Sequence, residues 1–79
     1  MKTEEILAER ATTHGKFADN ARISQALKRI LSEGHYTDLQ QEALDMICLK
    51  LSRIVSNPNV KDHFDDIAGY AKLVANSLD

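Results

Sequence analysis

Acidic side chains at helical spacing occur in two neighbouring segments, and they are the residues of this chain best suited to chemistry. The first segment contains Glu42 and Asp45, and the second contains Asp62 and Asp66. Residues three or four positions apart share one face of a helix. Mg²⁺ prefers a few carboxylates, water and phosphate oxygens as ligands. Two facing helices can gather carboxylates around a metal, so these four residues are candidate magnesium ligands.

Two basic residues follow the first acidic pair at helical spacing. Lys50 and Arg53 can hold a phosphate beside the metal, since a guanidinium makes bidentate contacts to phosphate. Tyr70 supplies a ring that can stack on a base. A simpler interpretation stays open, because acids near a helix start and bases near a helix end complement the helix dipole. Arg53 can also pair with Asp62 or Asp66.

The other reactive residue types lack a motif. Cys48 lies among apolar residues, which predicts a buried and unreactive thiol. His14, His35 and His63 are scattered without zinc-ligand spacing, so we expect surface or helix-end roles for them. The chain has no phosphate-cradling glycine loop and no nucleophile elbow. No catalytic residue is therefore assigned.

The elements that position these side chains are predicted to be helices. Period-two alternation is rare, and Ala, Leu, Lys, Glu, Gln and Arg dominate. Thr37 and Gln40 have the capping-box spacing, and Pro58 disfavours helix at the residue before it. The predicted helices cover residues 4–13, 17 or 19 to 33, 37 to 55 or 56, and 60–78.

The faces of the last two predicted helices indicate how the domain is assembled. The third helix is apolar nearly all round, which is typical of a helix buried on most sides. A chain of 79 residues buries a small share of its surface. We therefore expect one all-α domain over residues 1–79, a four-helix array completed by homo-oligomerisation. A partner subunit should cover Met46, Leu49 or Leu73. The apolar face predicted for the fourth helix is Phe64, Ile67, Ala68, Ala71, Val74, Ala75 and Leu78.

Composition narrows the range of partners and compartments. The net charge is −2 with acids and bases well mixed, which argues against a nucleic-acid binder. No apolar run approaches the roughly 20 residues of a membrane span, and the first residues lack the apolar core of a signal peptide. We therefore expect a cytoplasmic protein without membrane contact.

Three segments carry a resemblance to a family of short phage and prophage proteins of uncharacterised function. The resemblance extends roughly from Leu7 to Val74. Members often have Tyr-Gly at the position of His14-Gly15, and Trp at the position of Phe64. The segments are Arg10-x-x-x-His14-Gly15-x-Phe17, Ala43-Leu44-Asp45-Met46-Ile47-x-x-Lys50-x-x-Arg53-Ile54, and Asp62-x-x-x-Asp66-Ile67-Ala68-Gly69-Tyr70.

More distantly, the chain resembles the all-α nucleoside-triphosphate pyrophosphohydrolases of the MazG and dimeric dUTPase type. That superfamily carries Glu-Glu-x-x-Glu on one helix and Glu-x-x-Asp on the next. The segment Gln41-Glu42-x-x-Asp45 corresponds to the first motif, and Asp62-x-x-Asp65, or Asp66 beside it, to the second. The chain departs from the pattern by having Gln41 in place of one acid and aspartate in place of two glutamates.

Two function classes follow. In the first, the protein is a Mg²⁺-dependent nucleoside-triphosphate pyrophosphohydrolase, in which the metal activates water and Lys50 and Arg53 neutralise the leaving pyrophosphate. In the second, it is a non-catalytic phage accessory protein that offers an apolar and acidic face to a host or phage protein. Converging carboxylates would favour the enzyme. Carboxylates that face solvent, or that pair with Lys50 and Arg53, would favour the accessory protein.

Overall fold

The computed structural model describes residues 2–79, apart from the side chains of residues 11–13. The described residues form four helices and no strand, which confirms the predicted all-α class. The helices are α1 (Thr3–His14), α2 (Phe17–Leu31), α3 (Asp38–Ser56) and α4 (Lys61–Ser77).

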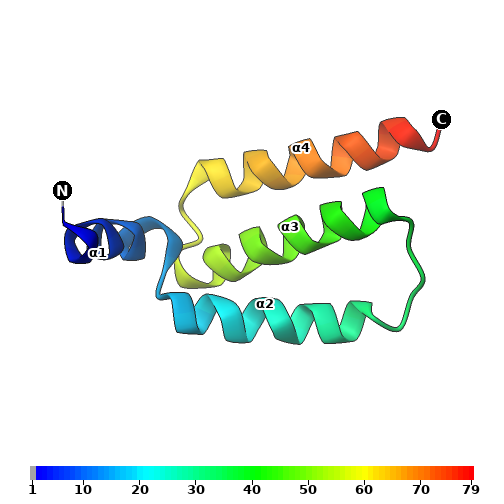
Figure 1. Ribbon diagram of the computed structural model, residues 1–79. Coiled ribbons are helices and arrows are strands. Elements are labelled where there is room, and N and C mark those ends of the chain that lie inside the picture. Colours follow the sequence, from blue (N-terminus) through cyan, green and yellow to red (C-terminus); the bar gives the residue numbers. More distant parts are fainter. Residues whose placement is uncertain (1) are drawn as a thin grey trace.

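Helices α2, α3 and α4 lie side by side in one layer, with α3 in the middle, and α1 extends away from one end of that layer (Figure 1). In the described part of the chain, α3 packs against both α2 and α4, whereas α2 and α4 do not pack against each other. The outline is elongated, at 44 × 23 × 22 Å. Helix α3 therefore lies at the centre of the layer.

The start of α3 is fixed by the predicted capping box. The Gln40 amide donates to Thr37 Oγ1 at 3.2 Å, and the Thr37 amide donates to Gln40 Oε1 at 3.0 Å. These bonds satisfy amides that a helix start leaves without partners. The helix ends at Ser56, and Asn57 before Pro58 has extended backbone, as the proline requires.

A single layer of helices buries little apolar surface. Among the residues whose burial is described, only Ala43 and Cys48 are buried and hydrophobic. Burial raises the pKa of the Cys48 thiol, in agreement with the unreactive thiol that was predicted. The buried polar residues outnumber the buried apolar ones and are Asn20, Ser24, Ser52 and His63.

The predicted core face of α4 is only partly correct. Phe64, which was expected inside, is 52% exposed, and its neighbours on the same side of the helix are also exposed. Because α4 packs against α3 alone, a narrow stripe of α4 is covered. That stripe shares Ile67 and Val74 with the predicted face and adds His63 and Tyr70 to them.

The turn between α1 and α2 is held against the end of α3. Gly15 has a φ of +79°, a left-handed conformation that favours glycine. A Cβ on Gly15 would overlap the Ser56 side chain, so Ser56 occupies the space that any larger residue would need. Asn20 Nδ2 donates to the His14 carbonyl at 2.5 Å, and Ser56 Oγ donates to Asn20 Oδ1 at 3.4 Å. The first helix, predicted over residues 4–13, therefore ends at His14 in a turn that is also a tertiary contact.

Alanine at Gly15 should be far more costly than alanine at Gly69. At Gly15, left-handed backbone costs about 1–2 kcal/mol, and the overlap with Ser56 adds about 1–3 kcal/mol. At Gly69, nothing lies within 4 Å of an added Cβ, so helix propensity should give a gain of up to about 1 kcal/mol. Urea unfolding of Gly15→Ala and Gly69→Ala measures both. Similar stabilities for the two variants would contradict the proximity of Gly15 to Ser56.

Candidate functional site

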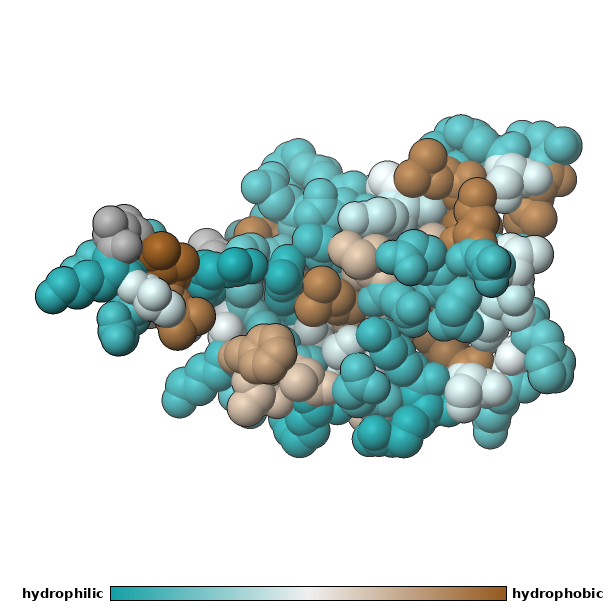
Figure 2. All heavy atoms as spheres, in the orientation of Figure 1, coloured by the Kyte–Doolittle hydropathy of each residue, from teal (hydrophilic) through white to brown (hydrophobic). Residues whose placement is uncertain are grey.

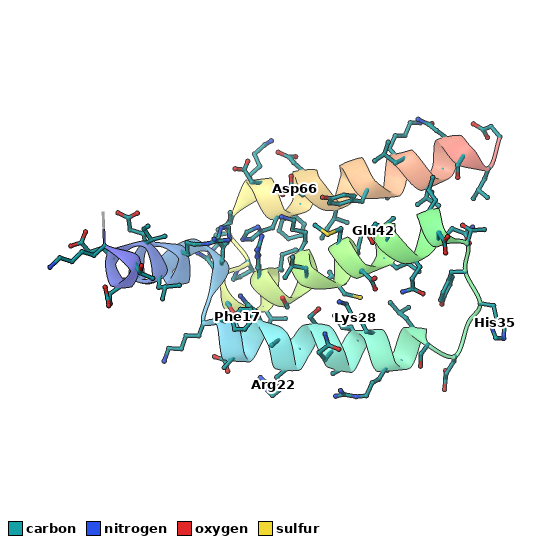
Figure 3. All side chains as sticks on the ribbon, viewed as in Figure 1. Phe17, Arg22, Lys28, His35, Glu42 and Asp66 are labelled. Carbon is teal, nitrogen blue, oxygen red and sulfur yellow. The ribbon has the colours of Figure 1, made fainter. Side chains whose placement is uncertain are left out.

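The four predicted metal ligands do not come together within one chain. Asp45 accepts a hydrogen bond from Gln41 Nε2 at 3.0 Å and lies on the side of α3 that faces α2. Glu42 is exposed on α3, and Asp62 and Asp66 are exposed on α4 (Figure 3). In the described part of the chain, no group of three or more His, Cys, Asp or Glu side chains could hold a metal ion. The magnesium site stays a prediction, and it would need a further contribution beyond this chain.

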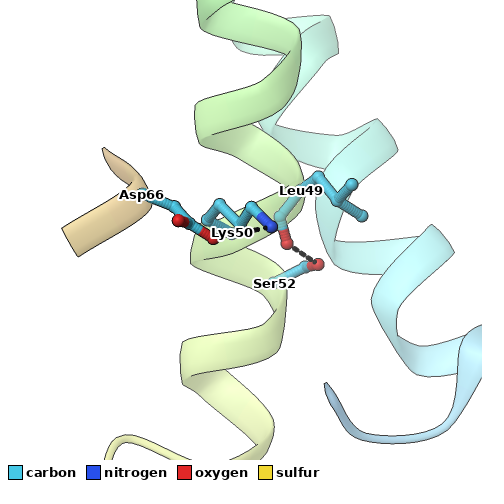
Figure 4. A network of polar contacts seen from close by, with 4 residues as sticks. All are labelled: Leu49, Lys50, Ser52 and Asp66. Carbon is cyan, nitrogen blue, oxygen red and sulfur yellow. Dashed lines mark hydrogen bonds and ion pairs between the residues drawn. The ribbon is translucent and has the colours of Figure 1, made fainter. Parts of the chain in front are cut away.

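Lys50, one of the two predicted phosphate ligands, is paired with an acid of the neighbouring helix. Its Nζ lies 3.0 Å from Asp66 Oδ2, so the pair joins α3 to α4 (Figure 4). The Lys50 side chain is 12% exposed and the Asp66 side chain 46%. A pair with one exposed partner contributes up to about 1 kcal/mol. Lys50 therefore serves the contact between the helices.

Arg53, the other predicted phosphate ligand, lies one turn after Lys50 on α3 and lines a groove of about 760 Å³ between α1, α2 and α3. Leu7, Phe17, Met46 and Leu49 supply much of its apolar wall. We call it the basic groove because one acid, Asp45, shares its lining with five basic residues. These are Arg10, His14, Lys16, Lys28 and Arg53.

Two buried nitrogen atoms on residues that line the basic groove have no hydrogen-bond partner among the described residues. They are His14 Nδ1 and Arg53 Nε. The His14 ring stacks obliquely on His63, with centroids 5.3 Å apart and planes at 43°. A buried polar atom without a partner costs about 1–3 kcal/mol, and in native proteins it often indicates a bound water, ion or ligand.

The electrostatic potential around His14 and Arg53 is positive. Burial lowers the pKa of His14, and the neighbouring Arg53 and His63 lower it further. Burial also lowers the pKa of Arg53. The charge of Arg10 lowers this pKa further, and the charge of Asp66 raises it. Each charged group therefore raises the cost of charging the others, and an anion in the groove would relieve that cost.

Sequence reasoning missed most of this site. His63, expected at a surface or helix end, is only 2% exposed, because α4 turns it towards α3 and the His14 ring. The polar residues Asn20, Ser24 and Lys28 recur every fourth position along α2, and this spacing is the signal that predicts a polar inward stripe. Tyr70, proposed to stack on a base, is half-buried on the inward stripe of α4.

The fold and site define a small all-α domain with a basic groove beside its central helix. Over residues 2–78 the chain matches the family described as Domain of unknown function (DUF6378), and it belongs to that family. No curated protein and no solved structure matches it. In the part that the structure describes, no helix has both the length and the apolar character needed to cross a membrane.

The stability of the protein should fall as the pH is lowered through the range in which His14 titrates. The pKa of His14 in the folded chain lies below its ordinary value of 6.5. At a pH between the folded-state pKa and 6.5, the unfolded chain binds more protons than the folded chain, so acid favours unfolding. The groups that face His14 are Arg10, Lys50, Arg53 and His63. Urea unfolding at about pH 7.5 and about pH 5.5 measures the loss.

The matched variants are His14→Gln and His35→Gln, since His35 is exposed in the loop between α2 and α3. The first replacement should reduce the acid sensitivity, and the second should leave it unchanged. Equal acid sensitivity in the two variants would assign the effect to other groups.

Proposed function

We propose that the protein functions as a homo-oligomer in which a second copy covers the apolar surface that one chain leaves open. The observation that carries the proposal is the near absence of a core. Only two apolar residues are buried among those described, whereas Val55 is 65% exposed and Leu78 is 69% exposed. Hydrophobic side chains reach the surface over α1 and over the C-terminal half of α4 (Figure 2). Exposed apolar area of this kind is typical of an interaction surface.

The surface best suited to a second copy runs along α4 and continues onto α3. The exposed residues Phe64, Ala68, Ala71, Ala75 and Leu78 are spaced by four and three in alternation, which is the heptad pattern of packed helices. Ala71 borders a hollow of about 520 Å³ together with Leu44 and Ile47 of α3. Leu51 and Val55 continue the side of Leu44 along α3. We call this set the outer apolar face. In a dimer with two-fold symmetry, the outer apolar face of one copy would pack against the same face of the other.

The proposed interface differs from the one first expected. Met46 and Leu49 line the basic groove and are half-buried against α2, so they are already partly covered. Leu73 is exposed but lies on the side of α4 opposite Phe64. The outer apolar face therefore replaces these residues in the proposal.

Of the two function classes, we favour the non-catalytic one: a phage or prophage accessory protein that binds a host or phage protein. The Lys50–Asp66 ion pair supports it, because this pairing occupies a carboxylate that the enzyme would use for the metal and a lysine that it would use for phosphate. The start of α4 also combines Asp62 and Asp66 with the exposed Phe64 ring. A partner with a basic and apolar surface would fit this combination.

Glutamate at Ala68 should reduce the molar mass in solution and leave the helix content intact. Ala68 is exposed in the middle of the outer apolar face, and a second copy would bury the new charge at high cost. Asn76→Glu is the matched control, since Asn76 is exposed on another side of α4. Light scattering and circular dichroism measure mass and helix content. A wild-type protein that stays monomeric at high concentration would contradict the proposal.

The second candidate is a Mg²⁺-dependent nucleoside-triphosphate pyrophosphohydrolase completed by assembly. The observation that favours it is that Asp45 and Arg53 line one groove of about 760 Å³, which is a size suited to a small ligand. In this proposal Glu42, Asp45, Asp62 and Asp66 from more than one copy hold Mg²⁺. Arg53 contacts phosphate, and Lys50 and Tyr70 contact the nucleotide only after rearrangement of their present contacts.

Under the catalytic proposal, Mg²⁺ should shift the amide signals near Glu42 and Asp45, and the protein should release pyrophosphate from one nucleotide of a panel. Asp62→Asn combined with Asp66→Asn should abolish both effects, because half of the carboxylate ligands lose their charge. Asp79→Asn removes an exposed charge at the C-terminus and serves as the control. Mg²⁺-dependent shifts that persist in the double variant would eliminate this metal site.

A further inference from the structure

We propose that the basic groove is a binding site for a phosphoryl group or another compact oxyanion of a small molecule. Arg53 and His14 would hold the anion, and Lys28, which lines the same groove, would contact it from α2. The site differs from the acidic constellation on α3 and α4, and its occupation needs neither Mg²⁺ nor catalysis.

The first support is the concentration of positive charge in a chain that is acidic overall. The net charge is −2 with histidine neutral, yet two lysines, two arginines, His14 and one acid line this groove. The basic residues come from α1, from the turn that follows it, from α2 and from α3, so tertiary structure brings them together. The ion pairs Lys50–Asp66 and Lys61–Asp65 lie outside the groove. Focused positive potential in a concave site attracts anions.

The second support is the pair of buried nitrogens that lack partners. Arg53 Nε is a permanent donor, and His14 Nδ1 becomes a donor in the protonated ring. Neither atom has a hydrogen-bond partner among the described residues. An oxyanion accepts several hydrogen bonds at once, so one group bound beside the Arg53 and His14 side chains would offset their mutual repulsion.

The third support is the backbone at the start of α2. Gly15, Lys16 and Phe17 line the groove, and the residue that precedes the helix, Lys16, makes no side-chain capping bond. The first amides of a helix carry partial positive charge and bind anions. The helix start therefore adds donors to the same site that the two side chains occupy.

The shape of the groove favours a small molecule. It is a hollow between three helices, with apolar walls from Leu7, Met46 and Leu49, whereas a nucleic-acid site would need a basic stripe along the surface. Phe17 is 86% exposed on the groove and offers its ring to any aromatic part of the ligand (Figure 3). Pyrophosphate and nucleotides share the oxyanion, and only a nucleotide would also use Phe17.

The test is a titration of the ¹⁵N-labelled protein with inorganic pyrophosphate in EDTA at about 150 mM NaCl, where weak surface binding is screened. We expect saturable shifts at the amides of residues 15–20, at Arg53 Nε and at the His14 ring, and none at the His35 ring. Orthophosphate, an adenine nucleotide and a uracil nucleotide form parallel arms. Tighter nucleotide binding that Phe17→Ala removes would identify an aromatic ligand, and equal affinities would identify the oxyanion alone.

The variants separate specific from general electrostatic binding. Arg53→Lys and Lys28→Gln should each weaken pyrophosphate binding roughly tenfold, the usual effect of losing a charged hydrogen bond. Lys61→Gln, which changes an exposed lysine paired with Asp65 on α4, should change affinity less than about twofold. Lys28→Gln keeps the test valid if Arg53→Lys fails to fold.

Saturable shifts confined to the groove support the proposal. Three outcomes would each overturn it. They are shifts spread over surface lysines, equal affinities in the Arg53, Lys28 and Lys61 variants, and no response because a second copy fills the groove. Light scattering on the same samples reports the oligomeric state separately. Loss of self-association without loss of pyrophosphate binding would therefore contradict the proposed assembly and leave this site intact.

Discussion

One layer of three helices cannot enclose a hydrophobic core, and this constraint explains most features of the domain. Helix α3 is covered on two sides, while α2 and α4 each have one neighbour in the layer. A helix with one neighbour needs only a narrow apolar stripe. The apolar residues beyond that stripe stay on the surface, and the domain is left with an outer apolar face on α3 and α4.

The interior at the end of the layer where α1 joins is polar rather than apolar. Asn20, Ser24, Ser52 and His63 are buried there, and the left-handed turn at Gly15 brings the end of α1 against Ser56. Polar groups in such a place must be satisfied by each other or by something from outside. Asn20 satisfies the His14 carbonyl, whereas His14 Nδ1 and Arg53 Nε are left for an external partner. His14 therefore takes part in the helix junction through its carbonyl and in the proposed anion site through its ring.

Sequence patterns predicted the local structure well and the contacts between helices less well. The capping box at Thr37, the break at Pro58 and the stop at Gly15 are local signals, and each was confirmed. The inward stripe of α4 could not be derived in the same way, because Phe64 and Ile67 are both apolar and only the number of neighbouring helices decides which of them is covered. The pairing of Lys50 with Asp66 was one of the alternatives that the sequence left open. The approach of His14 to His63 depends on residues 49 positions apart in the chain, which no local pattern specifies.

The position of α1 has a thermodynamic consequence for whatever enters the basic groove. Leu7 and Arg10 of α1 line it, and α1 extends away from one end of the layer (Figure 1). The wall that α1 adds to the groove therefore exists only while α1 is docked. An occupant that contacts both α1 and α3 binds the docked state alone, so its binding energy and the docking of α1 are linked. The C-terminal half of α1 completes the groove. The protection of α1 against hydrogen exchange therefore rises as the groove is occupied.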